Sequence, residues 1–405
     1  MKTSARFNRI FAVALATTGI AGFSAPAFAQ DGASQADNGG IQDIIVSARR
    51  RNESIQTTPV AVTAIAPSQL EGAAAVTIGD LQGAAPNVLI TVQATGSAAA
   101  NVSIRGIAFA DIEKSFDPAV GINVDGVYIG TSTGQMLDFF DIGSIEILRG
   151  PQGTLFGRNT IAGVINIKRS RPTQEWGGKF ETSFGKYGSF GARAVLNAPI
   201  VEGVLGLKVF EMHQQSDGFY KDGVTGKNRG GNNNENFGAS LLFTPSSKFD
   251  ALLTLEQQEQ KFEPMTGPLT KSGDVFCAFL PQCGGNGTKD IYTVYPVGPQ
   301  YGTYRAPAAT LEMNYDADVI KFTSVTSYRK STERQVEDYS TSGLYIGDRA
   351  QKYHQFSQEL RGSGKIGDNF DYVAGAYYFK SRYHLIQNTL VFGGAGPTQD
   401  TVGTS

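Results

Sequence analysis

The chain has few of the residues that carry catalytic or redox chemistry. Among its 405 residues there are only two cysteines and three histidines. His213, His354 and His384 are scattered along the sequence, so they form no pattern typical of a zinc site or a catalytic triad. Cys277 and Cys283 stand close together in a segment rich in glycine and proline, with no histidine nearby. We therefore expect no metal site, no cofactor and no enzymatic function.

Two further absences limit the class of protein. The formal net charge is −2, so no strongly basic surface points to nucleic acid as a partner. After the amino-terminal segment, no apolar run reaches the roughly 20 residues that a transmembrane helix needs. Glycine (49), phenylalanine (25) and tyrosine (16) are nevertheless abundant. An aromatic-rich chain without apolar helices favours an outer-membrane β-barrel, although the composition also fits a secreted soluble β protein.

The amino terminus has the pattern of a secretory signal peptide. Basic residues precede the apolar stretch Ile10–Phe23, which is too short to cross a bilayer, and Ala27-Phe28-Ala29 follows as a cleavage pattern. We predict a signal peptide over residues 1–29 and a disordered leader over residues 30–51. In an exported chain, Cys277 and Cys283 are expected to form a disulfide.

Residues 52–172 have the pattern of one compact α/β unit. Pro59–Ile65 predicts a strand and Thr77–Leu81 a short helix. Asp125-Gly126 stands between two alternating runs and gives a strong hairpin signal. Arg105 and Arg149 each follow an apolar strand residue and precede a glycine, which places both guanidinium groups where a strand ends and the backbone turns. An ordinary surface arginine in a turn has the same pattern.

The stretch Ser144–Ser170, SIEILRGPQGTLFGRNTIAGVINIKRS, is the most informative one in the chain. An alternating run ends at Arg149, a loop with Gly153 and Gly157 follows, and a second alternating run ends in basic residues. The loop does not fit a phosphate-binding P-loop, because no Lys-Ser or Lys-Thr pair follows its last glycine. In length and order the stretch resembles the end of the plug domain of TonB-dependent outer-membrane receptors. The resemblance extends over residues 43–172.

The resemblance implies a TonB box in the leader. The short β-prone run that would form it consists of Asp43, Ile44, Ile45, Val46, Ser47 and Ala48. An extended segment on a flexible leader can add to the edge of a partner's sheet, and main-chain hydrogen bonds then transmit a pull. The partner implied is TonB with its inner-membrane energising complex. A simple first strand, or part of a linker, would have the same sequence pattern.

Residues 173–405 consist of long alternating segments. In one of them Phe237, Ala239 and Leu241 alternate with Gly238 and Ser240, which is the apolar-out, polar-in pattern of a membrane barrel with an aqueous lumen. Short turns near residues 199–203, 245–248, 316–318 and 364–369 alternate with longer loops near residues 217–233, 262–303 and 328–351. Short periplasmic turns and longer extracellular loops are typical of such barrels.

The predicted fold class is an α+β plug domain followed by an antiparallel transmembrane β-barrel that is incomplete. We count about nine strands, whereas a barrel that holds a plug is of the kind with about 22. The last residues, Thr401–Ser405, have the composition of a loop. We therefore expect residues 173–405 to be the amino-terminal part of a barrel, truncated in this chain.

The resemblance also implies an ionic lock between plug and barrel. Arg105 and Arg149 would pair with glutamates of the barrel wall, since the planar guanidinium binds a carboxylate through two parallel hydrogen bonds. Alternation places Glu312 and Glu359 on positions that face the lumen, so either is a candidate partner.

Ligand contacts are expected in the outer loops of the plug and the barrel. Aromatic residues there can stack on a siderophore, while cationic side chains attract its anionic groups. For a single aromatic residue, a membrane-interface belt or packing inside a loop is an alternative explanation. The candidates are Phe109, Asp111, Phe116, Tyr295 and Tyr301.

The function implied by the resemblance is energy-coupled import across the bacterial outer membrane. A ferric siderophore is the first choice of cargo, and cobalamin, a carbohydrate or an aromatic compound could use the same framework. Outer-membrane lipid would surround the barrel. A passive porin would explain the barrel segments but not the plug, and a secreted binding module would explain export and strands alone.

Overall fold

The computed structural model describes residues 45–47, 49–50, 53–72, 77–92, 99–108, 117–135, 141–264, 292–296, 298–340, 343–367, 370–391 and 394–404. All of them belong to one compact unit, Asp43–Ser405. In these ranges no helix is long and apolar enough to cross a bilayer. The predicted signal peptide and the predicted disulfide between Cys277 and Cys283 lie outside the described residues.

The amino-terminal part, residues 45–172, is here called the plug-like unit and consists of short strands and helices. Its elements are β1 (Ile45–Val46), β2 (Glu53–Ser54), β3 (Val62–Ile65), α1 (Pro67–Gly72), the 3₁₀ helix η1 (Ile78–Leu81), β4 (Val88–Val92), β5 (Ala100–Ile104), β6 (Val120–Val124), β7 (Val127–Tyr128), β8 (Ile142–Arg149), α2 (Gly153–Phe156) and β9 (Gly163–Arg169). The predicted strand at Pro59–Ile65 and the predicted short helix at Thr77–Leu81 are confirmed as β3 and η1.

A five-stranded sheet forms the centre of the plug-like unit. Its strand order is β3-β8-β9-β6-β7, with β6 and β9 parallel and the other neighbours antiparallel. Ile122, Ile145 and Ile165 are fully buried in the core that these strands share with α1 and η1. The informative stretch Ser144–Ser170 is thus a buried strand pair, and the loop predicted between its strands contains the one-turn helix α2.

The hairpin predicted at Asp125-Gly126 is confirmed between β6 and β7. Both turn residues have positive φ, 50° at Asp125 and 81° at Gly126. A two-residue turn of this kind matches the twist of the flanking strands, and aspartate and glycine tolerate the left-handed backbone that it requires.

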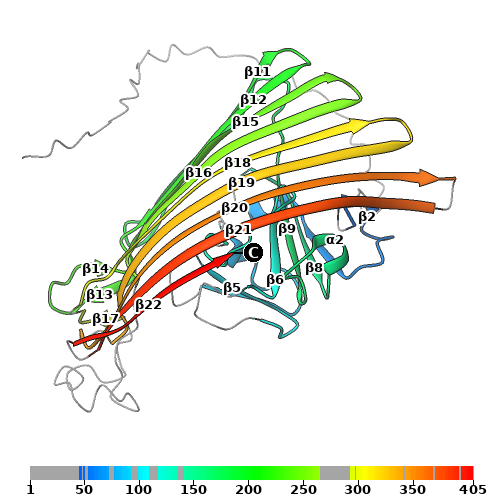
Figure 1. Cartoon of the computed structure of the whole chain (residues 1–405). Helices are drawn as coiled ribbons and strands as arrows, with labels where there is room; N and C mark the ends of the chain where they lie inside the picture. The colour runs from blue at the N-terminus through cyan, green and yellow to red at the C-terminus, as the bar shows by residue number, and fades with distance from the viewer. Residues whose placement is uncertain are drawn as a thin grey trace, which may run out of the picture. The chain divides into compact units, whose positions relative to one another are not determined.

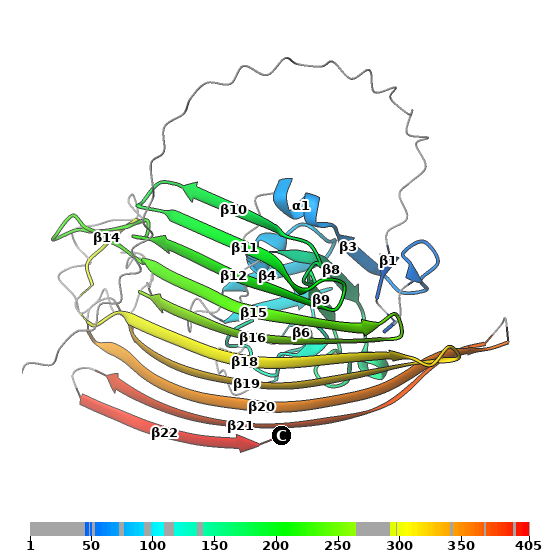
Figure 2. The same ribbon diagram turned by 90° about the horizontal axis from the view of Figure 1, so that it is seen from above.

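Ten antiparallel strands follow and form one curved sheet, here called the wall sheet (Figures 1 and 2). They are β10 (Gly177–Phe184), β11 (Phe190–Val201), β12 (Leu205–Ser216), β15 (Asn232–Ser246), β16 (Phe249–Phe262), β18 (Tyr301–Asp316), β19 (Ile320–Asp338), β20 (Tyr345–Ile366), β21 (Phe370–Val391) and β22 (Gly394–Thr404). They pair in this order, and the plug-like unit lies on the concave side of the sheet (Figure 1). A small separate sheet joins β13 (Tyr220–Asp222), β14 (Asn228–Arg229) and β17 (Thr293–Val294).

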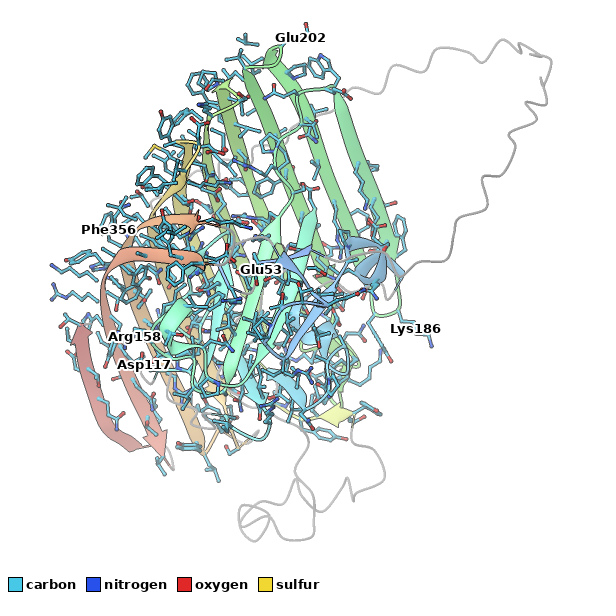
Figure 3. All side chains as sticks on the ribbon, turned by 90° about the vertical axis from the view of Figure 1, so that its right-hand side faces the viewer. Glu53, Asp117, Arg158, Lys186, Glu202 and Phe356 are labelled. Carbon is cyan, nitrogen blue, oxygen red and sulfur yellow. The ribbon has the colours of Figure 1, made fainter. Side chains whose placement is uncertain are left out.

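The predicted apolar-out, polar-in alternation is confirmed. On the face turned to the plug-like unit, called the inner face, Ser240 and Thr254 are buried and their hydroxyl oxygens lie 3.0 Å apart. On the outer face Phe237 and Leu241 are exposed. Figure 3 shows Phe356 of β20 pointing away from the plug-like unit in the same way. The side-chain period of two therefore separates a polar inner face from an apolar outer face.

The sheet has ten strands, which agrees with the expected count of about nine. Two other expectations about the wall sheet were wrong. The segment expected to be a terminal loop is strand β22, which pairs with β21; its glycines and proline look like a turn, but proline is tolerated on an edge strand. Most of the loop expected near residues 328–351 belongs to β19 and β20. Polar residues occupy both faces there, so the apolar alternation that marks a strand is lost although the backbone pairing continues.

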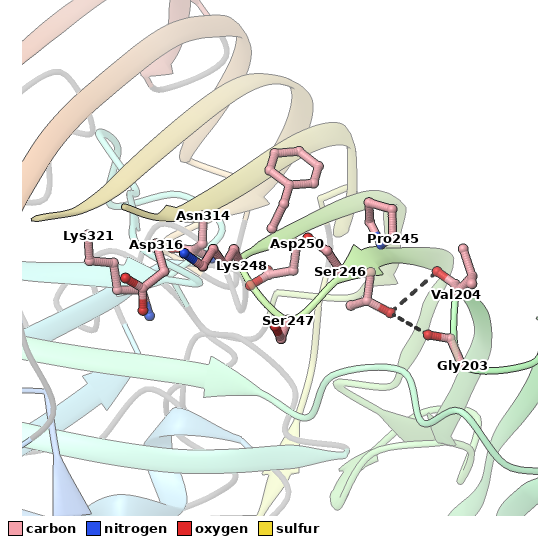
Figure 4. A pocket seen from close by; sticks show the side chains of 12 residues that line it. Gly203, Val204, Pro245, Ser246, Ser247, Lys248, Asp250, Asn314, Asp316 and Lys321 are labelled. Carbon is pink, nitrogen blue, oxygen red and sulfur yellow. Dashed lines mark hydrogen bonds between the residues drawn. The ribbon is translucent and has the colours of Figure 1, made fainter. Parts of the chain in front are cut away.

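The short turns between wall strands gather at one end of the sheet, called the short-turn end. A cavity of about 510 Å³ lies where the turns after β11, β15 and β18 meet (Figure 4). Its polar groups are used by the turns themselves: Thr244 Oγ1 donates to the Gly203 and Val204 carbonyls at 3.2 and 3.4 Å, and Lys248 Nζ lies 2.6 Å from Asp318 Oδ2. We therefore assign this cavity to the packing of the turns.

Candidate functional site: the contact between plug-like unit and wall sheet

A network of four charged side chains connects the plug-like unit to the wall sheet. At the end of β9, Arg169 Nε lies 2.6 Å from Asp125 Oδ2 and Nη1 lies 2.7 Å from Glu256 Oε2 of β16. Glu256 Oε1 also lies 3.0 Å from Nη1 of Arg329 on β19. The Glu256 and Arg329 side chains are 6% and 12% exposed. This network of Asp125, Arg169, Glu256 and Arg329, here called the ionic bridge, ties the end of β9 to two wall strands.

The hairpin turn explains how Asp125 reaches Arg169. Asp125 Oδ1 accepts a hydrogen bond from the Arg169 backbone N–H at 2.9 Å, while Oδ2 binds the guanidinium. Burial by itself lowers the pKa of Arg169, but the Asp125 and Glu256 carboxylates outweigh it, so the pKa is raised. Arg169 therefore keeps its charge inside the contact. Its guanidinium carbon also lies 5.9 Å from the centre of the Phe210 ring.

A buried lysine holds the exit of the plug-like unit. Lys208 of β12 is 3% exposed at its side chain, and its Nζ lies 2.7 Å from Asp141 Oδ2. The same ammonium group donates to the carbonyl of Ser170 and, at 3.2 Å, to its hydroxyl. Since Ser170 directly follows β9, the wall sheet grips the chain just where the plug-like unit ends.

Main-chain groups of the plug-like unit also bind the wall sheet. Gln355 of β20 donates from Nε2 to the Tyr128 carbonyl at 2.7 Å and accepts from the Gly130 N–H at 3.0 Å. The Tyr128 ring lies 5.8 Å from that of Phe379 on β21, and burial raises the pKa of Tyr128. One carboxamide thus pairs with two backbone groups, which fixes the segment after β7 against the wall.

The described part of the predicted TonB box is docked in the plug-like unit. Ile45 and Val46 form β1, which pairs with β2, and Val46 is 1% exposed. Ser47 donates to Glu146 Oε1 from its backbone N–H at 2.7 Å and from its hydroxyl at 2.9 Å. Asn166 Nδ2 donates to Glu146 Oε2 at 3.1 Å and to the Ser47 hydroxyl at 3.2 Å. The leader strand is therefore held by a buried carboxylate; Asp43, Ile44 and Ala48 lie outside the described residues.

Arg50 connects this docked strand to the wall sheet. Its Nε donates to the Leu155 carbonyl at 3.1 Å, and its guanidinium carbon lies 4.4 Å from the centre of the Phe156 ring. Its Nη2 lies 3.7 Å from Glu359 Oε2 of β20. Burial lowers the pKa of Arg50 and the Glu359 carboxylate opposes that shift. A cavity of about 220 Å³ adjoins the guanidinium, between α2 and the wall sheet.

In the described contacts the glutamates of the predicted lock bind other residues than Arg105 and Arg149, and a lock through these two arginines stays a prediction. Alternation did place Glu312 and Glu359 on the inner face, but Glu359 pairs with Arg50 and with Arg361 (2.5 Å), and Glu312 Oε1 accepts from Asn314 at 2.7 Å. Arg105 and Arg149 approach neither glutamate among the described contacts. Arg105 instead reaches the other arginine–glycine turn, since a Cβ on Gly150 would lie 3.5 Å from Arg105 Nη1.

The predicted ligand contacts receive little support. Phe109, Asp111 and Phe116 lie outside the described residues. Tyr295 is 39% exposed beside the small sheet, where a Cβ on Gly223 would meet its ring at 2.2 Å. Even-numbered residues of β18 face inward, so Tyr301 lies on the outer face, with Arg334 5.9 Å from its ring centre, and its role as a ligand contact stays a prediction. Tyr304, three residues on, is the inward-facing tyrosine and is 5% exposed.

Sequence reasoning missed the residues that make the contact. Asp125 was recognised for its turn, and Arg169 only as one of the basic residues at the end of the informative stretch. The alternation along each strand places Glu256, Arg329 and Lys208 on the inner face together with many other polar residues. Alternation alone does not say which of these residues meet the plug-like unit. Figure 3 shows another ion pair of this unit, between Arg158 and Asp117, whose Nη2 and Oδ2 lie 2.5 Å apart.

Residues 54–164 match the family model described as TonB-dependent Receptor Plug Domain. The chain is similar to the pesticin receptor of Yersinia pestis, with 26% identity over 392 residues that cover 94% of this chain and 53% of the relative. An iron-regulated outer membrane virulence protein of Vibrio cholerae is 31% identical over 167 residues, 40% of this chain and 24% of that protein. The chain spans about half the length of the first of these relatives.

Solved structures show the same fold. The ferric yersiniabactin uptake receptor FyuA from Yersinia pestis superposes with a TM-score of 0.73 at 23% identity, covering 85% of this chain and 52% of that one. The siderophore receptor PiuA from Acinetobacter baumannii gives a TM-score of 0.68 at 17% identity, covering 89% and 51%. The chain therefore contains a TonB-dependent receptor plug domain, seated on ten strands with the fold of the barrel wall of outer-membrane receptors.

Proposed function

We propose that the protein carrying this chain is a TonB-dependent receptor that imports a ferric siderophore across the bacterial outer membrane and is not an enzyme. The observation that carries the proposal is the seating of the plug: the ionic bridge and Lys208 hold it on the inner face of the wall sheet. The similar solved structures of siderophore receptors support the choice of cargo. In such import no bond of the ligand is made or broken.

The docked leader defines which contacts would break first when TonB pulls on it. For Ile45 and Val46 to pair with a strand of TonB, they must leave β2, and Ser47 must leave Glu146. Further along the chain, Arg50 is held to the wall by one ion pair of 3.7 Å. The carboxyl end of the plug is held by shorter contacts of Arg169 and Lys208. A pull on the leader therefore acts first on β1 and Arg50, while the end of β9 stays bound.

The proposal is tested by growth of a strain in which the gene of the full receptor is deleted. We expect the deletion to abolish growth on one member of a panel of ferric siderophores, and added inorganic iron to restore growth. A plasmid copy should restore uptake of the radiolabelled chelate, and a proton uncoupler should stop that uptake. Normal growth on every iron source would exclude siderophore import, and uptake that persists with the uncoupler would favour a passive porin.

A further inference from the structure

Five basic side chains gather on the outer face of the wall sheet, on β19, β20 and β21. His354 lies at their centre, because the strand register places Lys330 directly opposite it on one side and Arg382 on the other. Lys352 lies two residues away along β20, and Lys380 lies diagonally across on β21. All five residues are exposed. Lys330, Lys352, His354, Lys380 and Arg382 are here called the basic cluster.

The residues beside His354 show which way the basic cluster points. Tyr353 and Gln355, its neighbours in the chain, are buried at 5% and 1% exposure, and Gln355 binds the plug. Successive side chains of a strand point to opposite faces, so His354 points away from the plug. Phe356, two residues on, points the same way (Figure 3). The basic cluster therefore lies on the surface that an outer-membrane barrel presents to lipid.

No carboxylate balances the basic cluster in the part of the chain that the structure describes. None of its five side chains has an ion pair or a side-chain hydrogen bond there. Acidic residues of the same face have other partners: Glu259 lies 3.3 Å from Arg305, Asp348 lies 3.1 Å from Arg334, and Asp400 lies 2.8 Å from His384. Like charges on neighbouring strands destabilise a sheet. A bound anion would relieve the repulsion within the basic cluster.

The position along the strands places the basic cluster at a membrane boundary. Toward the short-turn end it adjoins the exposed aromatic residues Tyr328, Phe356 and Tyr378, and the exposed Leu360 follows. Aromatic residues mark the boundary of the apolar band of a membrane barrel, and short turns are typical of its periplasmic end. The basic cluster lies on the opposite side of these aromatic residues, toward the longer loops. This is the depth at which the headgroups of the outer leaflet lie.

The width of the basic cluster favours a headgroup with more than one phosphate. Lys330 and Arg382 belong to strands that are two strand spacings apart, about 9–10 Å. A single phosphate is too small to contact both sides of such a surface, whereas two phosphates on one sugar headgroup can. Lysine and arginine bind phosphate through charge-assisted hydrogen bonds, and basic sites at a membrane boundary bind lipid headgroups.

We propose that the basic cluster binds the phosphate groups of lipopolysaccharide, the phosphorylated glycolipid of the outer leaflet. Its acyl chains then lie along the apolar surface below, where Phe356 and Leu360 are exposed. The inference goes beyond ligand import and does not depend on the identity of the cargo. It assigns Lys352, Lys380 and Arg382 to the holding of a specific lipid.

The test measures lipid binding to the full receptor in detergent by native mass spectrometry. The probes are lipid A with its two phosphates and the same lipid A after enzymatic dephosphorylation. We expect the phosphorylated form to bind at least about tenfold more tightly. The triple variant Lys352→Gln, Lys380→Gln, Arg382→Gln should weaken its binding by at least about tenfold and leave binding of the dephosphorylated form unchanged.

The matched control removes the same charge at the short-turn end. It is the triple variant Lys248→Gln, Lys321→Gln, Lys365→Gln, in which the Lys248 and Lys365 side chains are 51% and 73% exposed. These lysines lie beyond the other boundary of the apolar surface. We expect the control variant to bind phosphorylated lipid A as tightly as the unmodified receptor.

Equal binding of phosphorylated lipid A by the two triple variants would overturn the inference, provided that both keep their heat-modifiable electrophoretic mobility. If the cluster variant does not fold, Lys352→Gln and Lys380→Gln are measured singly, and unchanged binding by both would overturn it as well. Equally tight binding of phosphatidylglycerol would indicate a site for any anionic phospholipid. Displacement of lipid A by inorganic phosphate would indicate a site for free anions. Either result would refute the assignment to lipopolysaccharide.

Discussion

At the scale of single residues, the ionic bridge depends on one carboxylate. Glu256 uses Oε2 for Arg169 and Oε1 for Arg329, and its side chain is 6% exposed. Glu256→Gln removes the carboxylate that pairs with Arg329 and leaves Arg169 with Asp125 alone. We expect the full receptor to lose about 3 kcal/mol of unfolding free energy, the scale for breaking a buried ion pair, and its plug to be cleaved faster by protease.

The control for this prediction is Glu259→Gln. Glu259 lies on the same strand but on the outer face, where Arg305 Nε is 3.3 Å away and both side chains are solvent-accessible. Exposed ion pairs contribute little to stability, so the free energy of unfolding in urea should be nearly unchanged. Equal losses in the two variants would mean that Glu256 does not couple plug and wall.

A second residue-scale prediction concerns Ser47. Ser47→Ala removes the hydroxyl that donates to Glu146 and leaves only the backbone N–H of the leader. We expect a loss of about 1 kcal/mol, the usual net value of one hydrogen bond. The measurement is the rate at which a maleimide labels Val46→Cys, a position that is 1% exposed. Labelling should accelerate with Ser47→Ala and stay unchanged with Ser68→Ala, an exposed serine of α1; an unchanged rate in both would show that Glu146 does not hold the leader.

At the same scale, the sequence indicates the type of contact but not the residues that make it. Glu359 was expected to bind a plug arginine and does, but the arginine is Arg50. An arginine–glycine turn fixes where a guanidinium starts, not which direction it takes. The Arg105 guanidinium reaches the turn at Gly150, and that arrangement depends on how the turn after β5 packs against the turn after β8, which is a tertiary property.

At the scale of elements, the segment after β7 fits the wall because Gly130 has no side chain. A Cβ there would lie 2.5 Å from the Tyr353 hydroxyl and 2.8 Å from the Phe379 ring. Gly130→Ala should therefore push this segment off β20, break the Gln355 hydrogen bonds and cost about 1–3 kcal/mol, the range for overpacking. The readout is the midpoint of thermal unfolding of the full receptor.

Gly153→Ala is the matched control for that variant. Gly153 begins α2, and a Cβ there meets nothing within 4 Å, so stability should stay the same or rise slightly. If the two alanine variants have the same midpoint of thermal unfolding, the close approach at Gly130 does not set the position of the segment after β7.

Elements with a strong local pattern were predicted, and elements without one were not. The β6–β7 hairpin was found from Asp125-Gly126, because only a few residue types accept two left-handed positions in succession. Most wall strands were found from their period of two. Strand β22 was missed, and so were the ends of β19 and β20 that lie near the connection between them. Their pairing is made by backbone groups, which any polar residue carries.

At the scale of the whole molecule, binding and energy coupling should separate. Deleting residues 43–48 removes the predicted TonB box, including the docked residues Ile45 and Val46. We expect the deleted receptor to bind its chelate with unchanged affinity, because the wall sheet and the rest of the plug-like unit are intact, and to import none. Surface binding and internalised radioactivity, measured on the same cells, distinguish the two steps. Import by the deletion variant would show that the leader is not the coupling segment.

The contacts of the inner face also make the wall depend on the plug for its polar balance. Lys208, Glu256 and Gln355 belong to three different wall strands, yet each finds its partner on the plug. Without the plug, Lys208 would lose Asp141, Glu256 would lose Arg169, and Gln355 would lose its two backbone partners. The plug therefore completes hydrogen bonds and ion pairs that β12, β16 and β20 leave open toward the inner face.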